Sequence, residues 1–301
     1  MSVATPAEST REFGRTSRQV AVRKTRAGIM RWVFLAATCV SILALGTLLW
    51  TVLERGLPWL SWHLITDMPS RRPERAGLNS ALFGTLWVVS LTAVIAFPIG
   101  VGAAIFLEEY APRNRWTTTL QVNISNLAGV PSVVYGLLGL GIFVNFLGIG
   151  RVVLAGALTM ALLSLPVIII ASQEALRAVP LTLRQAAYGV GATRWQVTRH
   201  HVLPAAFPAI LTGTILSISR AIGETAPVLV VGASAYIATR PSGFFDGYTV
   251  LPMQIYGWTQ RSQDEFKNGL APAAIIILLA VLLVMNSAAI ILRQKFTNRN
   301  H

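Results

Sequence analysis

The chain has 301 residues, of which 53% are hydrophobic and only 12% are charged, and its formal net charge is +13. Soluble globular domains contain about 25% charged residues, so this composition excludes an ordinary soluble protein and indicates an integral membrane protein. The basic residues are spread around apolar stretches, which argues against nucleic-acid binding. Most of the positive charge fits the Lys and Arg bias of cytoplasmic loops, and an affinity for anions is the alternative interpretation.

The N-terminal residues 1–30 are polar and basic, and we expect them to form a disordered cytoplasmic tail. The apolar run that follows is too long for a cleavable signal peptide. Six apolar stretches are each long enough to cross a membrane as a helix, and none shows the alternation of a strand. They lie near residues 31–53, 80–107, 117–149, 152–171, 209–232 and 268–292.

The fold class predicted from these stretches is an all-α integral membrane protein with six transmembrane helices. We expect a membrane domain over residues 31–292, which includes a loop at 172–208, and a cytoplasmic tail at 293–301. The third stretch is long enough to contain a break around residues 129–132. At the prolines inside apolar stretches we expect kinks rather than breaks, since neighbouring helices can satisfy the freed carbonyl. These prolines are Pro98, Pro131, Pro166 and Pro227.

Six crossings place both termini on one side of the membrane. If that side is the cytoplasm, the inside segments carry 16 Lys and Arg residues and the outside segments carry 8. This bias predicts a multi-pass protein of the cell membrane with both termini cytoplasmic. A cluster of Arg71, Arg72 and Arg75 in the outside segment 54–79 runs against the trend.

Several residues of possible chemical interest remain. Cys39 is the single cysteine, so no intramolecular disulfide forms, and the adjacent His200 and His201 lack the spacing of a helical metal pair; we expect no metal site. Glu108 and Glu109 form a carboxylate pair that acid–base chemistry could use, but their neighbours favour an interfacial turn. We therefore expect no catalytic residue in this chain.

The segment 172–208 is an unusual loop between two spans. Residues 181–190 follow a proline and can form an amphipathic helix, with Leu183, Ala186, Ala187 and Val190 on one stripe. A second short helix is expected at about residues 193–202, ended by Pro204. From these residues alone, an interfacial helix on the lipid headgroups and a docking element for a cytoplasmic partner are equally good interpretations.

The sequence "QAAYGVGATRWQVTRHHVLP" within this loop resembles the EAA loop of ABC-importer permeases. Five positions match the pattern, namely Ala186, Ala187, Gly191, Leu203 and Pro204, while Gln185 replaces the usual Glu and His201 the usual Ile. The resemblance implies that the loop holds a coupling helix, with Gln185 at its Glu position, that docks in a groove of an ATPase subunit.

Nucleotide chemistry is not expected in this chain itself. A phosphate-binding Walker A loop needs Gly-Lys, and no lysine here follows a glycine. The chain is therefore predicted to be no enzyme and to bind no cofactor, with ATP and Mg²⁺ held by a partner ATPase.

Arg220 and Glu224 are charged residues inside the fifth apolar stretch, where a charge costs about 2.5–3.5 kcal/mol. At a spacing of four they share one face of a helix and can form an ion pair. A structural pair between helices is one interpretation. The other is a polar site on a pathway, where the planar guanidinium of Arg220 meets an anion and Glu224 tempers the attraction.

The surrounding sequence "RAIGETAPVLVVGA" closely resembles the fifth span of permease subunits of phosphate ABC importers. Further matching phrases are "LNSALFGTLWVV", "FLEEYAP", "AGVPSVVYGL" and "LPVIIIASQEALRAVP". The resemblance covers residues 40 to 292. It implies a type I importer permease fold and a phosphate path that includes Arg220, Glu224 and Thr225.

The same resemblance implies partners. These are a second permease subunit in a heterodimer, two ATPase subunits and an extracytoplasmic phosphate-binding protein, with a histidine-kinase signalling complex as a further one. Because selectivity in this superfamily resides largely in the binding protein, a permease for phosphonate, sulfate or molybdate is an alternative. A phosphate-sensing membrane scaffold is another.

Overall fold

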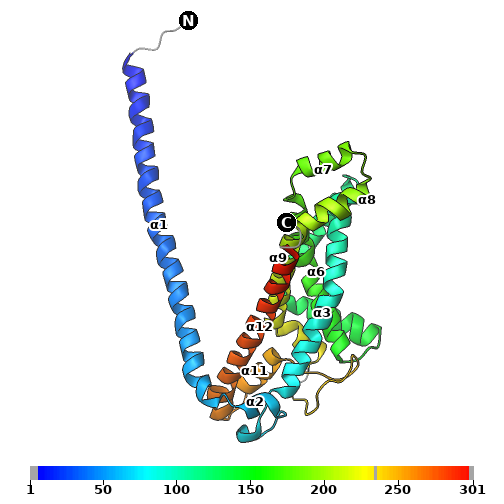
Figure 1. Cartoon of the computed structure of the whole chain (residues 1–301). Coiled ribbons are helices and arrows are strands. Elements are labelled where there is room, and N and C mark those ends of the chain that lie inside the picture. Colours follow the sequence, from blue (N-terminus) through cyan, green and yellow to red (C-terminus); the bar gives the residue numbers. More distant parts are fainter. Residues whose placement is uncertain (1–5, 234–235, 298–301) are drawn as a thin grey trace. The chain divides into compact units, whose positions relative to one another are not determined.

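The computed structural model describes residues 6–233 and 236–297, and the regular structure of these residues is helical throughout (Figure 1). The chain divides into two units, residues 1–54 and residues 55–301. Each unit is described by itself.

The first unit consists of most of helix α1 (Pro6–Gly56), and the candidate span Ala27–Trp59 begins in this helix. Residues 6–30 belong to this helix, so the disordered tail expected there is replaced by helical structure. The segment is rich in Arg and Ala, which are good helix formers, and these outweigh its Ser, Thr and Gly. Residues 1–5 of the expected tail lie outside the described part of the chain.

The second unit contains the other candidate spans. By length and composition, the described residues hold five helices that could cross a membrane, or six when one sharply bent pair is counted as a span, which confirms the fold class predicted from the sequence. The candidate spans of the second unit are, in chain order, α3 (Asn79–Ile105) with the wide turn η3 (Phe106–Tyr110), the bent pair, α6 (Val153–Arg177), α9 (Leu203–Gly223), and α12 (Ala271–Thr297) after η6 (Glu265–Leu270). Helix α12 extends through Thr297 into the tail expected at 293–301, of which residues 298–301 are not described.

The third span is broken at the place that the sequence indicated. Helix α4 (Arg115–Ala128) and helix α5 (Ser132–Gly139), which continues as η4 (Leu140–Phe146), meet at an angle of 103°. Pro131 is the extended residue before α5, so a break replaces the kink expected at this proline. The Tyr135 hydroxyl donates a 2.8 Å hydrogen bond to the carbonyl of Leu127, which satisfies an acceptor near the end of α4.

The fifth span is also broken, where a continuous kinked helix was expected over residues 209–232. Helix α9 ends at Gly223, Glu224 is extended (φ −77°, ψ 115°), and helix α10 (Ala226–Val231) begins with Pro227 in its first turn. Proline is tolerated in the first turn of a helix because the N–H that it lacks would have no partner there. By contrast, Pro98 and Pro166 lie within α3 and α6 without ending either helix.

Pro204 does not end the second short helix of the loop, as the sequence had suggested. Helix α8 (Arg194–Val197), η5 (Thr198–Val202) and α9 form one continuous run of 30 residues. The wide π turn of η5 precedes Pro204 and changes the backbone register at the point where the proline ring would meet the carbonyl of the preceding turn.

Helices α3, α6 and α9 form the centre of the second unit. Small side chains such as Ala96, Ala104, Ala161 and Ala206 are buried between them, so the helices approach closely. A loop at 236–250, which joins α10 to α11 (Leu251–Thr259), lies on α3; its Thr249 carbonyl would come within 1.9 Å of a Cβ placed on Gly84.

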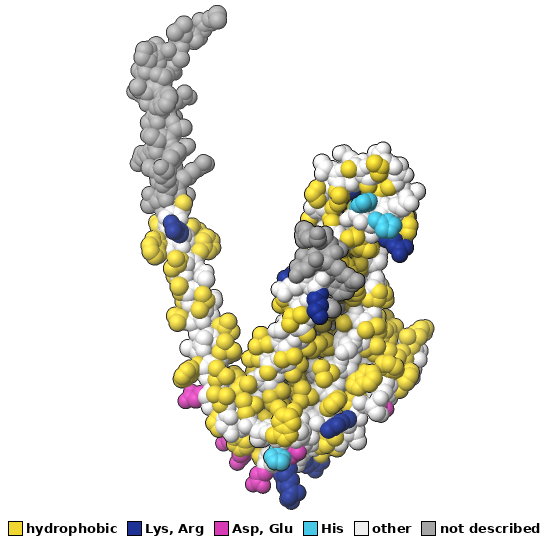
Figure 2. Space-filling model, viewed as in Figure 1, with side chains coloured by type: hydrophobic (Ala, Val, Ile, Leu, Met, Phe, Trp, Pro, Cys, Tyr) yellow, Lys and Arg dark blue, Asp and Glu magenta, His cyan; other side chains and the backbone are white. Residues whose placement is uncertain are grey.

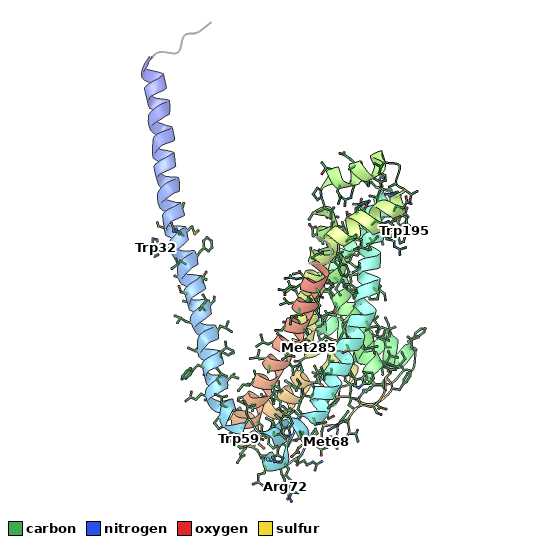
Figure 3. All side chains as sticks on the ribbon, in the orientation of Figure 1. Trp32, Trp59, Met68, Arg72, Trp195 and Met285 are labelled. Atoms are coloured by element: carbon green, nitrogen blue, oxygen red, sulfur yellow. The ribbon has the colours of Figure 1, made fainter. Side chains whose placement is uncertain are left out.

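The charged side chains of the second unit lie mainly toward its two ends. Figure 2 shows hydrophobic side chains over the middle of the visible face, with histidine and basic side chains near the end that carries the loop at residues 172–208. Helix α7 (Leu181–Gly189) and α8 mark one end, while α2 (Trp62–Thr66) and the short turns η1 (Leu57–Trp59) and η2 (Pro73–Arg75) mark the other. In Figure 3, Trp195 lies at the first end, Trp59 and Arg72 at the second, and Met285 between them.

Candidate functional site

The candidate site is the ion pair at the break between α9 and α10. Arg220 occupies the last turn of α9, and its Nε lies 3.4 Å from Oε1 of Glu224. The pair expected from the spacing of four residues therefore forms, although Glu224 is extended rather than helical. Its two members differ in exposure, since the side chain of Arg220 is 65% exposed and that of Glu224 is 21% exposed. The guanidinium of Arg220 thus faces outward from this chain, whereas the carboxylate of Glu224 is largely buried.

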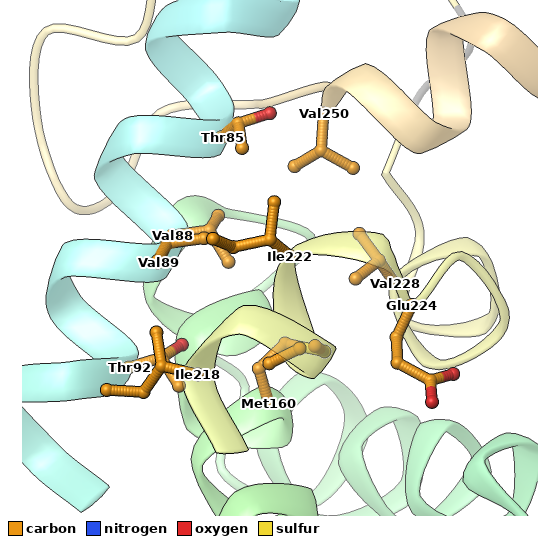
Figure 4. A pocket seen from close by; sticks show the side chains of 11 residues that line it. Thr85, Val88, Val89, Thr92, Met160, Ile218, Ile222, Glu224, Val228 and Val250 are labelled. Atoms are coloured by element: carbon orange, nitrogen blue, oxygen red, sulfur yellow. The ribbon is translucent and has the colours of Figure 1, made fainter. Parts of the chain in front are cut away.

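Two small cavities flank the ion pair. The cavity beside Arg220 has a volume of about 20 Å³ and includes Ser164 and Ser217. The cavity beside Glu224 has a volume of about 10 Å³ and is lined mostly by apolar side chains of α3, α6, α9 and α10 (Figure 4). A cavity of about 10–15 Å³ holds a single water molecule, so neither admits a tetrahedral oxyanion. An anion that reaches Arg220 must therefore meet it on its exposed side.

Thr225, the third residue expected on the path, is half-buried beside Glu224. It is the N-cap residue of α10, and its carbonyl accepts the amide of Leu229 at 2.9 Å. The structure thus brings Arg220, Glu224 and Thr225 together at one helix break. Their role on a substrate path stays a prediction.

Asn286 is a neighbour of this site that the sequence analysis missed. Its side-chain oxygen is hydrogen-bonded to the hydroxyl of Ser219, the residue before Arg220. Asn286 lies in α12, 67 residues away, so no local pattern reveals the contact. A polar amide inside the apolar stretch 268–292 was nevertheless a signal, because such groups in membrane helices usually bond across to a neighbouring helix.

The residues of the EAA-like motif fall into an exposed and a buried group. Gln185 and Ala186 are exposed on α7, whereas Ala187 is buried against the core. Gly191 follows α7 with φ +86°, a left-handed conformation that glycine adopts without strain. Leu203 and Pro204 lie half-buried at the beginning of α9.

Apolar side chains are exposed on the same loop. They are Leu181, Leu183, Tyr188, Val190 and Trp195, and we refer to them together as the α7–α8 face. Val190 lies beyond the end of α7, so the stripe expected through it is not formed. Exposed apolar surface of this kind, rimmed by polar residues, is typical of a protein or membrane contact.

Comparison with known sequences gives consistent matches over most of the chain. The family model described as "Binding-protein-dependent transport system inner membrane component" matches residues 96–298. The phosphate transport system permease protein PstA 1 of Mycobacterium tuberculosis is 35% identical over 289 residues, covering 92% of this chain and 91% of that protein. The probable ABC transporter permease protein YqgI of Bacillus subtilis is 29% identical over 266 residues, or 85% of this chain and 90% of that protein.

A solved structure shares the fold. One chain in the crystal structure of a bacterial alginate ABC transporter, in complex with an alginate pentasaccharide-bound periplasmic protein, superposes with a TM-score of 0.63. The match covers 89% of this chain and 95% of that chain at 16% sequence identity. At this identity the likeness establishes the fold alone.

Proposed function

Because this chain belongs to the family of binding-protein-dependent transport system inner membrane components, we propose that it is a permease subunit of an ATP-driven importer of inorganic phosphate. The observation that supports phosphate as the substrate is the 35% identity to a phosphate transport system permease over nearly the whole length of both chains. This relation also supports the resemblance to phosphate importer permeases seen in the sequence.

Arg220 supplies chemistry that suits this substrate. A guanidinium presents a planar fork of donors that matches two oxygens of a phosphate. Glu224, with its Oε1 3.4 Å from Nε of Arg220, offsets part of the positive charge, so that the anion is attracted and can still leave. Thr225 adds a hydroxyl beside the pair.

A second permease subunit completes the path in this proposal. The side chain of Arg220 is 65% exposed on this chain alone, and the adjoining cavities are too small for the anion. A charged group on a membrane helix normally faces the interior of a bundle or a water-filled cavity. The partner subunit would supply the facing wall, so that phosphate passes between the two chains.

ATPase subunits would bind at the α7–α8 face. Its exposed apolar residues provide buried area for a docked partner, and the exposed Gln185 and Ala186 of the EAA-like motif lie on the same helix. ATP and Mg²⁺ would be held by those subunits, and a binding protein would deliver phosphate at the opposite end. We further propose that both termini of the chain lie in the cytoplasm, as the distribution of Lys and Arg predicts.

The test is phosphate uptake by vesicles that contain this chain with its neighbouring permease, ATPase and binding protein. Arg220→Ala is expected to lower radiolabelled phosphate uptake by about 10- to 100-fold, because it removes charge-assisted hydrogen bonds to the anion. Arg220→Lys retains the charge but not the fork, and should fall between Arg220→Ala and wild type.

Arg115→Ala is the matched control, since Arg115 is an exposed arginine at the start of α4, away from the site. It should leave uptake unchanged. Normal uptake by an assembled Arg220→Ala complex would contradict the pathway role of Arg220. Uptake of phosphonate, sulfate or molybdate in place of phosphate by the wild type would keep the importer and change its substrate.

A further inference from the structure

Arg184 joins helix α7 to the membrane core by three hydrogen bonds. Its Nη1 donates to the carbonyl of Val179 at 2.8 Å, and its Nη2 donates to the carbonyl of Leu176 at 2.8 Å. The third bond runs from Nη2 to Oε1 of Glu109 at 3.0 Å. The side chains of Arg184 and Glu109 are only 16% and 9% exposed. A shielded ion pair of this kind holds its two elements in a defined geometry.

Glu109 belongs to the wide turn η3, which follows the long helix α3. Its neighbours Glu108 and Tyr110 each contact an arginine as well. Glu108 Oε1 lies 2.5 Å from Nη2 of Arg177, in the last turn of α6. The ring of Tyr110 lies 5.3 Å from the guanidinium carbon of Arg194, the first residue of α8. Three consecutive residues of η3 thus engage three different elements at this end of the second unit. We refer to Glu108, Glu109 and Tyr110 as the η3 anchor.

The geometry of η3 explains how three neighbours reach different partners. A π turn is wider than an α turn, and it changes the direction in which successive side chains leave the backbone. Wide turns of this type are frequent at functional sites and are retained although they are less stable than a regular α-helix. The sequence presents the same residues simply as a charged, aromatic end to an apolar span.

Helix α3 connects the η3 anchor to the ion pair. Thr85, Val88 and Thr92 of α3 line the cavity that also contains Glu224 (Figure 4). From Thr92 to Glu109 the helix extends over about 25 Å at 1.5 Å per residue. A single element therefore touches the surroundings of Glu224 at one end and holds α7 at the other.

We infer that Glu109 is a positioning residue for transport: its ion pair with Arg184 makes α7 and α3 move together, so that displacement of α7 by ATPase subunits reaches the surroundings of Glu224. This inference rests on the proposed function. Glu108 and Tyr110 guide the flanking elements, while the buried Glu109–Arg184 pair is the contact with α7 itself. Without the pair, ATP hydrolysis continues and drives less transport.

The test measures phosphate transported per ATP hydrolysed in vesicles that contain the complete complex. Glu109→Gln and Arg184→Gln are each expected to lower this ratio by about two- to thirtyfold, with ATP hydrolysis maintained. Arg184→Gln removes the contact with Glu109 and also the two bonds to the carbonyls of Val179 and Leu176. The double variant should therefore be no worse than Arg184→Gln alone. Glu174→Gln is the matched control: Glu174 contacts Arg177 at 3.2 Å but lies on exposed surface outside the η3 anchor, and its ratio should equal that of wild type.

A cross-linking rescue separates linkage from simple loss of stability. In a Cys39→Ser background, Glu109→Cys with Arg184→Cys removes the ion pair and is expected to uncouple the complex. A short bifunctional maleimide that joins the two positions should then restore the ratio, because α7 and α3 again move as one. A merely structural pair would give no such recovery.

The inference is overturned by a wild-type ratio in assembled Glu109→Gln, by additive effects of the two Gln substitutions, or by a cross-link that blocks transport. A result that contradicts phosphate as the substrate can be distinguished from these outcomes. If wild-type vesicles take up another oxyanion, phosphate is wrong as the cargo, and the ratio measured with that oxyanion still tests the link between α7 and α3.

Discussion

The hydroxyl of Tyr135 stabilises the break in the third span by donating to the carbonyl of Leu127 at 2.8 Å. Tyr135→Phe removes this donor and leaves the carbonyl of Leu127 with the amide of Val130, at 3.1 Å, as its remaining partner. We expect the free energy of unfolding to fall by about 1 kcal/mol, as measured in detergent by chemical denaturation. Tyr256→Phe, on the exposed side of α11, is the control and should have a smaller effect. Equal effects of the two substitutions would show that this hydrogen bond does not stabilise the break.

Asp246 makes the loop 236–250 sensitive to pH. Hydrogen bonds from the hydroxyl and amide of Ser242 and from the amide of Gly243 lower the pKa of Asp246 below its ordinary value of 3.8. A lowered folded-state pKa adds stability that is present above pH 3.8 and is lost as pH falls through the folded-state pKa. The melting temperature of wild type should therefore exceed that of Asp246→Asn at pH 7. The difference should shrink as the pH falls below 3.8 and through the folded-state pKa of Asp246.

Glu74→Gln removes an exposed carboxylate from η2 and is the control for the Asp246 experiment. Its difference in melting temperature from wild type should vary less with pH. A difference for Asp246→Asn that stayed constant from pH 7 into strong acid would contradict the role assigned to the carboxylate.

At the scale of elements, close packing between the loop 236–250 and α3 depends on Gly84. A Cβ at this position would lie 1.9 Å from the carbonyl oxygen of Thr249, so Gly84→Ala must displace backbone and should destabilise the protein by about 1–3 kcal/mol. Gly102→Ala, in the same helix, meets no atom within 4 Å and should be neutral or stabilising by up to about 1 kcal/mol. Unfolding of the two variants in the same detergent gives the comparison; equal stabilities would contradict it.

The two broken spans show how far the sequence predicts local structure. Around residues 129–132, glycine and proline lie together in a stretch longer than one span, so a break could be expected there. The second break, at Glu224, was missed because length, apolarity and the spacing of Arg220 and Glu224 all fit one continuous helix. Only the combination of Gly223 with Pro227 marks the boundary, and such a pair is also compatible with a kink.

Contacts between distant residues were beyond prediction from the chain alone. The loop motif indicated where α7 forms, and the apolar pattern indicated its neighbours α6 and α9. Glu109 and Arg184, however, are 75 residues apart, and their pairing depends on how α3 and α6 pack. From the sequence, Glu109 is expected only to belong to an interfacial turn, because nothing local identifies the partner of a charged residue.

At the scale of the whole molecule, the direction of insertion is the prediction that labelling can test directly. With both termini in the cytoplasm, the α7–α8 loop faces inward and the loop 236–250 faces outward. In a Cys39→Ser background, a membrane-impermeant maleimide added to intact cells should label Phe245→Cys and leave Gly189→Cys unlabelled. Both positions are exposed in the structure, so their difference reports the side of the membrane. The reverse pattern would invert the topology.

If a second permease subunit covers Arg220, as proposed above, the outward-facing guanidinium has a consequence for the supply of this protein in the cell. A copy inserted without a facing subunit would hold that charge against hydrocarbon, at a cost of about 2.5–3.5 kcal/mol. Such orphan copies should be removed by membrane proteases, while assembled copies persist. The amount of this chain in the membrane would then follow the synthesis of whichever partner is scarcer, so balanced production of the two chains becomes a requirement set by one side chain.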